Sequence, residues 1–280
     1  MRVGVIGPLT ADSLAKHILH CLADLEVTPV PLHSQGPKEP GRITRYSMEA
    51  LRRIGAEGEL FTQRPIGRRA VAERCDVVIN TLQALMPEVV GTMKAAGIKV
   101  GIWFPDNVGN VGRMSIVASD YDAIFLKDPL FVDRLEKVYG MPAHYMPEAC
   151  NPTWHHPEGD PTAEPYIVSV GNIYPTRARL LARLASDGVP LKLFGGNDGH
   201  SLGLAGGAFP RWFDPGVLAD HHTGGPVFRM DKSRVFRQAR GVLNNLHPAE
   251  MDSVNCRLFE ATAAGAAVLC ERRESLRDLF

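Results

Sequence analysis

A segment near the carboxyl-terminal end, residues 246–270, gathers carboxylates, amides and an arginine around a predicted helix start. It reads LHPAEMDSVNCRLFEATAAGAAVLC. The pattern predicts a helix over residues 253–264, ended by Gly265, and then a buried strand. A helix N-terminus carries unpaired N–H groups and partial positive charge, so it suits a phosphate group. The chemistry that such a segment could do is to hold a nucleotide and its sugar.

The same side chains also permit a plainer interpretation. Asp252 or Ser253 could simply cap the helix. Arg257 could form a surface ion pair, and Glu260 could be a solvated helix residue. Agreement with other polar segments of the chain favours the ligand-binding interpretation.

The elements that must position these residues alternate between strand and helix, which is typical of α/β proteins with parallel sheets. Strands are expected at residues 2–7, 28–32, 76–80, 99–104, 122–126, 166–171, 191–194, 241–245 and 266–270. Helices are expected at 11–25, 47–55, 67–74, 87–96, 128–139, 177–185 and 233–239. A proline-rich, charged segment at 151–165 interrupts the alternation. The sequence therefore predicts two Rossmann-like domains that face a cleft, residues 1–152 and 153–280.

The carboxyl-terminal segment resembles the donor-binding signature of GT-B glycosyltransferases of the glycosyl transferases group 1. It is most similar to the CgeB-like group, which is named after a spore maturation protein. That signature is an N-x-R-x-F-E-A helix, matched here by Asn255, Arg257, Phe259, Glu260 and Ala261. Further matches are W-x-x-D at 103–106, P-E-A-C-x-P at 147–152 and G-N-x-Y-P-x-R at 171–177.

Many retaining GT-B enzymes carry two acids with seven residues between them, and Asp252 and Glu260 have that spacing, with Asp in place of the usual first Glu. The resemblance implies that Asp252 touches the transferred sugar and that Glu260 binds the ribose hydroxyls. Eight helical steps rise roughly 12 Å, the order of distance between the two sugars of a nucleotide-diphosphate sugar. Ser253 and Asn255 are expected donor contacts at the helix start.

In open α/β sheets, ligands gather beyond the carboxyl ends of the strands, so residues that follow a strand are candidate contacts. Gly171 and Asn172 follow one predicted strand, and Gly171 lets backbone approach a ligand. Arg177 and Arg179 can neutralise a diphosphate, with bidentate geometry available to either. The alternative is two exposed arginines on a first helical turn.

Three further residues follow predicted strands. Gly195 could sit under the nucleobase, although a plain turn fits nearly as well. His247 could reach the donor sugar or a phosphate oxygen, or it could simply be solvated. In the first domain, Asp106 could orient the acceptor or act as a base on its hydroxyl, or it could open a turn. We interpret His17 and His20, on the first predicted helix, as core or surface histidines.

The bulk composition limits the possible partners. Lys plus Arg is 31 and Asp plus Glu is 31, so no basic field attracts nucleic acid or a membrane surface. The 5 cysteines are odd in number and include no CxxC pair, which indicates reduced thiols. The start MRVGVIGPLT lacks the features of a signal peptide, and no apolar run approaches the roughly 18 residues that a bilayer requires. A cytoplasmic protein without integral membrane contact is therefore expected.

Several motifs are missing from the sequence. The first strand is not followed by GxGxxG, and there is no GxxxxGK[ST] loop and no zinc-ligand spacing. No cofactor and no metal are therefore expected.

We predict a metal-independent, hexosyltransferase-like glycosyltransferase that moves a sugar from a nucleotide-diphosphate donor to a hydroxyl acceptor. The alternatives are a nucleotide-sugar epimerase of the same fold and a non-catalytic ligand-binding protein. Members of the group usually continue past the position of Phe280, so the resemblance implies a second domain that is incomplete at its carboxyl-terminal end.

Overall fold

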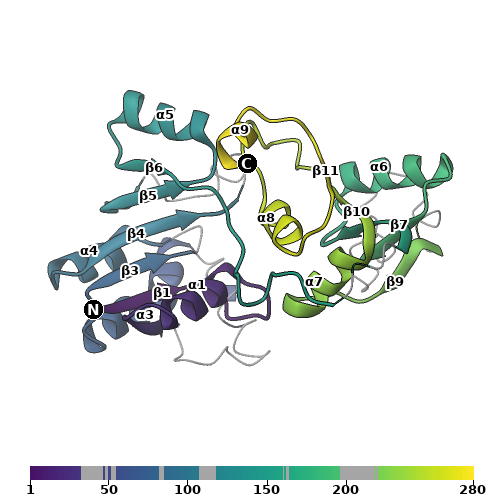
Figure 1. Cartoon of the computed structure of the whole chain (residues 1–280). Coiled ribbons are helices and arrows are strands. Elements are labelled where there is room, and N and C mark those ends of the chain that lie inside the picture. The colour runs from purple at the N-terminus through teal and green to yellow at the C-terminus, as the bar shows by residue number, and fades with distance from the viewer. Residues whose placement is uncertain are drawn as a thin grey trace. The chain divides into compact units, whose positions relative to one another are not determined.

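The computed structural model describes residues 1–32, 47, 50–51, 55–81, 85–106, 118–159, 161, 164–195, 218 and 220–280. The chain forms two units, Met1–Pro147 and Glu148–Phe280, each with its own parallel sheet (Figure 1). The boundary between the units thus lies a few residues before the one predicted from the sequence, which follows residue 152. In the described part of the chain, no helix is long and apolar enough to span a membrane.

The first unit is a parallel sheet with helices between its strands. Its elements are β1 (Arg2–Ile6), α1 (Leu14–Ala23), β2 (Thr28–Leu32), α3 (Ala56–Ala72), β3 (Val77–Asn80), α4 (Pro87–Ala95), β4 (Lys99–Phe104), β5 (Ala123–Leu126), α5 (Pro129–Tyr139) and β6 (Ala143–Tyr145). The strand order is β2-β1-β3-β4-β5-β6. Most of the strands are apolar runs, which suits a sheet covered on both faces.

Local sequence explains the ends of several helices. Pro129 begins α5, and Asp128 caps it, because its carboxylate accepts hydrogen bonds from the N–H groups of Leu130 at 3.1 Å and Phe131 at 3.2 Å. Gly140 ends the same helix in the left-handed conformation, with φ 63°. In the second unit, Gly265 follows the last helical turn before β11 with φ 76°, as the sequence predicts.

The second unit repeats this construction with its own sheet. Its elements are β7 (Glu164–Val170), α6 (Pro175–Ser186), β8 (Leu191–Phe194), β9 (His222–Gly224), α7 (Arg229–Gln238), β10 (Ala239–Asn244), α8 (Cys256–Ala263), β11 (Val268–Cys270) and α9 (Leu276–Leu279). The strand order is β11-β10-β7-β8-β9. The chain runs outward from β7 to β9 and then returns to the other side of β7 with β10. The order therefore reverses between β7 and β10, where open α/β sheets bind their ligands.

Two apolar clusters cover the two faces of the second sheet. On one face, Val168 and Val242 pack with Phe236 of α7 and Ala261 of α8. On the other face, Leu193 packs with Ala178 and Leu181 of α6, and Ile167 and Leu243 lie against this second cluster. Helices α6 and α8 thus approach the sheet from opposite faces. Figure 1 shows α6 and α8 as separate helices of this unit, with α8 next to β11.

The structure differs from the sequence predictions in two respects. Helix α8 begins at Cys256 and not at Ser253, because Ser253 and Val254 are buried and Ser253 donates its hydroxyl hydrogen bond to the Glu250 carboxylate. The short edge strands β6 and β9 were not expected. Most of the predicted helix at 47–55 lies outside the described residues.

Candidate functional site

Two glycines allow the backbone to approach closely at the carboxyl ends of β7 and β8. Gly171 has φ 110° and Gly195 has φ 136°, a conformation that favours glycine. A Cβ atom at Gly195 would lie 2.5 Å from the carbonyl oxygen of Gly171. The Gly171 N–H donates a hydrogen bond of 2.8 Å to the Phe194 carbonyl. A side chain at either glycine would block this end of the sheet.

Arg177, in the first turn of α6, is buried and points back to the strand ends. Its Nε donates to Asn245 Oδ1 at 2.8 Å, and its Nη2 donates to the Asn245 carbonyl at 3.2 Å. Its Nη1 donates to the Asn172 carbonyl at 2.6 Å. The guanidinium carbon lies 4.7 Å from the centre of the Tyr174 ring, a cation–π distance. Within the part of the chain that the structure describes, Arg177 is therefore held in one orientation by neutral groups.

Arg257, in the first turn of α8, reaches the same place from the other face of the sheet. Its Nη1 donates to Asn244 Oδ1 at 3.1 Å. A Cβ atom built on Gly171 would lie 2.7 Å from Arg257 Nη2 and 3.7 Å from Arg177 Nη1. Both guanidinium groups therefore border the backbone of Gly171.

The two arginines form a concentration of positive charge. Across the described residues, no carboxylate lies within ion-pair distance of Arg177 or Arg257. Burial, followed by the charge of Arg257, lowers the pKa of Arg177 to about 10. A bound anion would offset both effects, because it would pair with the two cations. The arrangement suits a phosphate-bearing ligand.

His247 lies beside this arginine pair. Its Nδ1 accepts a hydrogen bond of 3.1 Å from the Ala249 N–H, and its ring centre lies 5.1 Å from that of Tyr174. The Tyr174 hydroxyl in turn accepts a hydrogen bond of 3.3 Å from Asn245 Nδ2. His247 is exposed, so its imidazole is accessible at the rim of the site.

Of the other predicted residues around Gly171, Asn172 accepts the hydrogen bond from Arg177 through its backbone carbonyl and not through its side chain. Arg179 is exposed further along α6 and takes no part in the Arg177 contacts just described.

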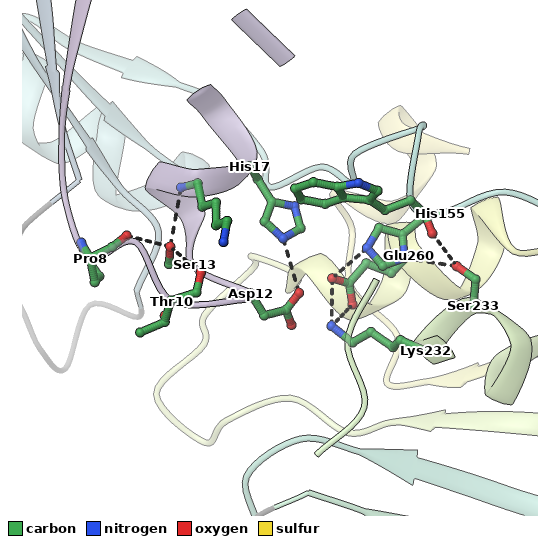
Figure 2. A network of polar contacts seen from close by, with 11 residues as sticks. Pro8, Thr10, Asp12, Ser13, His17, His155, Lys232, Ser233 and Glu260 are labelled. Atoms are coloured by element: carbon green, nitrogen blue, oxygen red, sulfur yellow. Dashed lines mark hydrogen bonds and ion pairs between the residues drawn. The ribbon is translucent and has the colours of Figure 1, made fainter. Parts of the chain in front are cut away.

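Glu260 lies in a buried polar network on the same helix as Arg257. Lys232 Nζ, on α7, lies 2.9 Å from both carboxylate oxygens of Glu260, and the two side chains are only 8% and 4% exposed. His155 Nε2 lies 3.6 Å from Glu260 Oε1. Figure 2 shows Lys232 and His155 directed at the Glu260 carboxylate.

The far side of the His155 ring is also held. Ser233 Oγ donates to the Trp154 carbonyl at 2.9 Å, and His155 Nδ1 lies 3.2 Å from the same Oγ. Because Ser233 has a single hydroxyl proton, His155 Nδ1 is the donor to Ser233. The network therefore ties α7 and α8 to the segment that follows the first unit.

Asp252 and the residues before α8 are held by local contacts. Asp252 Oδ1 accepts the Ser275 N–H at 3.3 Å, and the Ser275 hydroxyl donates to the Asp252 carbonyl. Asn255 occupies the N-cap position of α8 without a side-chain capping hydrogen bond. The carboxylate of Glu148 instead accepts the N–H of Cys256. The first N–H group of this helix therefore already donates a hydrogen bond to a carboxylate.

The first unit contains Asp106, half-buried just after β4. Near the start of α1, His17 Nε2 lies 3.2 Å from Asp12 Oδ1, and both side chains are partly buried (Figure 2). This imidazole–carboxylate pair was not expected from the sequence.

Within the second unit, the structure brings Gly171, Arg177, Gly195, His247 and Arg257 together.

The residues that hold the two arginines and Glu260 were also missed. Asn244 and Asn245, which accept hydrogen bonds from the arginines, carry a visible signal, since two amides end a predicted strand. Lys232 and His155, which contact Glu260, carry none that spacing could reveal. Among the described residues, no group of three or more His, Cys, Asp or Glu is placed to hold a metal ion.

Part of the chain is similar to a known protein family. Residues 177–280 match a family described as "Glycosyl transferase-like". This segment begins at Arg177 and includes α8 with Arg257 and Glu260. A search of curated proteins gives no match to the chain.

Several solved structures share the fold. A sucrose-phosphate synthase from Thermosynechococcus elongatus superposes with a TM-score of 0.65 at 13% identity, over 99% of this chain and 82% of that chain. The Anabaena protein HepE, in complex with UDP and glucose, gives 0.61 at 11% identity, over 100% and 83%. A glycosyltransferase from Rickettsia africae ESF-5 gives 0.56 at 9% identity, over 97% and 79%.

The predicted fold class is confirmed: the protein has the GT-B fold, with two α/β units built on parallel sheets. Residues 177–280 are thus similar to a glycosyl transferase-like family, and the whole chain has the fold of the solved structures named above.

Proposed function

We propose that the protein transfers a sugar from a nucleotide-diphosphate donor to a hydroxyl-bearing acceptor. One observation carries the proposal. Arg177 and Arg257 converge on Gly171 at the point where the strand order of the second sheet reverses. The leaving group of such a reaction is a nucleoside diphosphate, on which negative charge develops as the bond to the sugar breaks. Two oriented guanidinium groups stabilise that charge.

The finer assignment rests on the sequence motifs. The segments GNIYPTR at 171–177 and NCRLFEA at 255–261 support membership of the CgeB-like group. HepE, one of the proteins with the same fold, binds UDP and glucose. We propose a nucleotide-diphosphate sugar of this chemical kind as donor and a hexose as the transferred group. The two guanidinium groups would supply the charge, so we propose that the reaction needs no metal.

The remaining roles follow from position. Glu260 would bind the ribose hydroxyls, with its carboxylate oriented beforehand by Lys232. Asp252 and His247 would contact the transferred sugar or a phosphate oxygen. Asp106, or the pair of His17 and Asp12, would accept the proton of the acceptor hydroxyl. All five cysteines are free thiols, which supports a cytoplasmic location.

Isothermal titration against UDP, GDP, TDP and CDP tests the proposal first. Saturable binding of at least one of them is expected, and binding of none would refute it. Product analysis with the matching nucleotide sugar then separates the two enzymatic possibilities. A new glycoside identifies a transferase, whereas an inverted sugar on the same nucleotide identifies an epimerase.

A further inference from the structure

Asn244 is the last residue of β10 and Asn245 follows it directly, and each asparagine holds one of the two arginines. Asn244 Oδ1 accepts from Arg257, and Asn245 Oδ1 accepts from Arg177. Both asparagines are buried. They thus position cations that come from different helices.

Strand geometry explains why the two amides must be adjacent. Successive side chains of a strand point to opposite faces of the sheet. Along β10, Val242 packs on the face covered by α8, and Leu243 packs on the face covered by α6. Continuing this alternation directs Asn244 to the side of Arg257 and Asn245 to the side of Arg177.

The chemistry of the acceptors matters as much as their placement. A carboxylate at either position would accept the same hydrogen bonds, but it would form an ion pair and cancel one positive charge. An amide oxygen orients a guanidinium group and leaves its charge intact. The like charges remain close together, at a cost to the free protein that a polyanion can relieve.

We propose that Asn244 and Asn245 are positioning residues that set charge selectivity: they hold Arg177 and Arg257 oriented and uncompensated, so that the site prefers a diphosphate to a monophosphate or an uncharged nucleoside. This inference rests on the proposed function, since it takes the diphosphate of the donor to be the ligand. It adds the residues that maintain the charge and the reason why they are amides.

The test uses the near-isosteric variants Asn244→Asp and Asn245→Asp in the full chain. Titration calorimetry measures the affinity for inorganic pyrophosphate, UDP, UMP and uridine. Each variant should bind pyrophosphate and UDP roughly 10-fold or more weakly, because a full negative charge now lies beside the guanidinium groups. Any affinity for uridine should stay unchanged. Asn151→Asp is the matched control, since Asn151 is buried in the same unit and its Oδ1 accepts the Thr153 N–H at 3.0 Å.

Thermal unfolding supplies a readout that a merely structural role would not produce. Without ligand, the two variants should unfold at the same temperature as the wild type or higher, because charge repulsion is relieved. The stabilisation by pyrophosphate should shrink. If either variant fails to fold, Asn244→Ser and Asn245→Ser, which keep a neutral acceptor, should retain more pyrophosphate affinity than Arg257→Ala.

The outcomes separate this inference from the proposed function. Pyrophosphate affinity equal to that of the wild type in both Asp variants would overturn the inference. Weakened pyrophosphate binding in the variants, with no sugar transfer by the wild type, would support the inference and refute the transferase. If the wild type binds neither pyrophosphate nor any nucleoside diphosphate, both fail.

Discussion

Arg177 and Arg257 come from helices on opposite faces of one sheet and place their guanidinium groups beside the same glycine, Gly171. Neither side chain has a carboxylate partner in the described part of the chain. Folding has therefore assembled two like charges at the end of a central strand.

Replacing Arg257 by Ala should weaken the binding of a nucleoside diphosphate by about 1.5–3 kcal/mol, the usual contribution of a charged hydrogen bond. Stability should change little, because Arg257 makes a single hydrogen bond, to Asn244, within the described structure. Titration calorimetry and urea unfolding measure the two effects. Arg234→Ala is the control, since its ion pairs with Asp231 and Glu158 are exposed. Equal affinities for the two variants would argue against the arginine site.

Replacing Gly195 by Ala should destabilise the second unit more than its backbone angle alone requires. The left-handed conformation costs an L side chain roughly 1–2 kcal/mol. The methyl group would also collide with the Gly171 carbonyl, which we expect to add about 1–3 kcal/mol. Gly188→Ala is a matched control, since it has φ 79° and no heavy atom within 4 Å of its Cβ position. Urea unfolding measures both, and similar losses would mean that the two strand ends are not this close.

The Lys232–Glu260 pair separates stability from ligand binding. Glu260→Gln should cost about 3–5 kcal/mol, because it leaves a buried ammonium group without its counter-charge. The double variant Lys232→Met/Glu260→Leu should recover most of that loss. If Glu260 also contacts ribose, the recovered fold should still bind the nucleotide weakly. Normal nucleotide affinity in the double variant would assign Glu260 a purely structural role.

The exposed pair of Arg234 and Glu158 is the reference for this cycle, with an expected coupling of about 1 kcal/mol or less. A coupling of similar size between Lys232 and Glu260 would contradict their burial.

The decrease of the unfolding free energy at acid pH should depend on Asp122 in the first unit. Burial alone would raise the pKa of this carboxyl. The Val100 N–H at 2.8 Å and Lys99 Nζ at 3.2 Å donate hydrogen bonds to it, and the charge of Lys94 also favours the carboxylate. These interactions outweigh the effect of burial and leave the pKa below 3.8. A depressed folded-state pKa means that the stabilisation is fully present well above pH 3.8 and is lost as the pH falls through the folded-state value. Asp122→Asn should therefore flatten the dependence of unfolding free energy on pH in this acid range. Asp120→Asn, at an exposed carboxylate that pairs with Lys94, should leave the slope closer to that of the wild type.

The base that serves the acceptor can be identified by kinetics. If Asp106 or His17 accepts the proton, Asp106→Asn or His17→Gln should lower kcat about 10²- to 10⁴-fold. Donor affinity should stay unchanged, because both residues belong to the first unit. His20→Gln is the control on α1. A loss of donor affinity equal to the loss of rate would indicate a structural effect instead.

Sequence reasoning located the strands because buried parallel strands are apolar runs, and several of their bounds, such as Lys99–Phe104, match the predicted ones. It located Arg177 and Arg257 through motifs at strand ends. It misplaced the start of α8, since a polar Ser253 looks like a cap until its burial against Glu250 is known. It missed Lys232 and His155, because their partner Glu260 is distant in sequence and only folding brings them together.

The contact between Glu148 and the Cys256 N–H has a mechanical consequence. Glu148 is the first residue of the second unit, and Cys256 is the first residue of the helix that bears Arg257 and Glu260. The connection between the units is therefore fastened to the helix that presents the charged groups. A displacement of Glu148 would therefore disturb the contact at the helix start, one residue before Arg257.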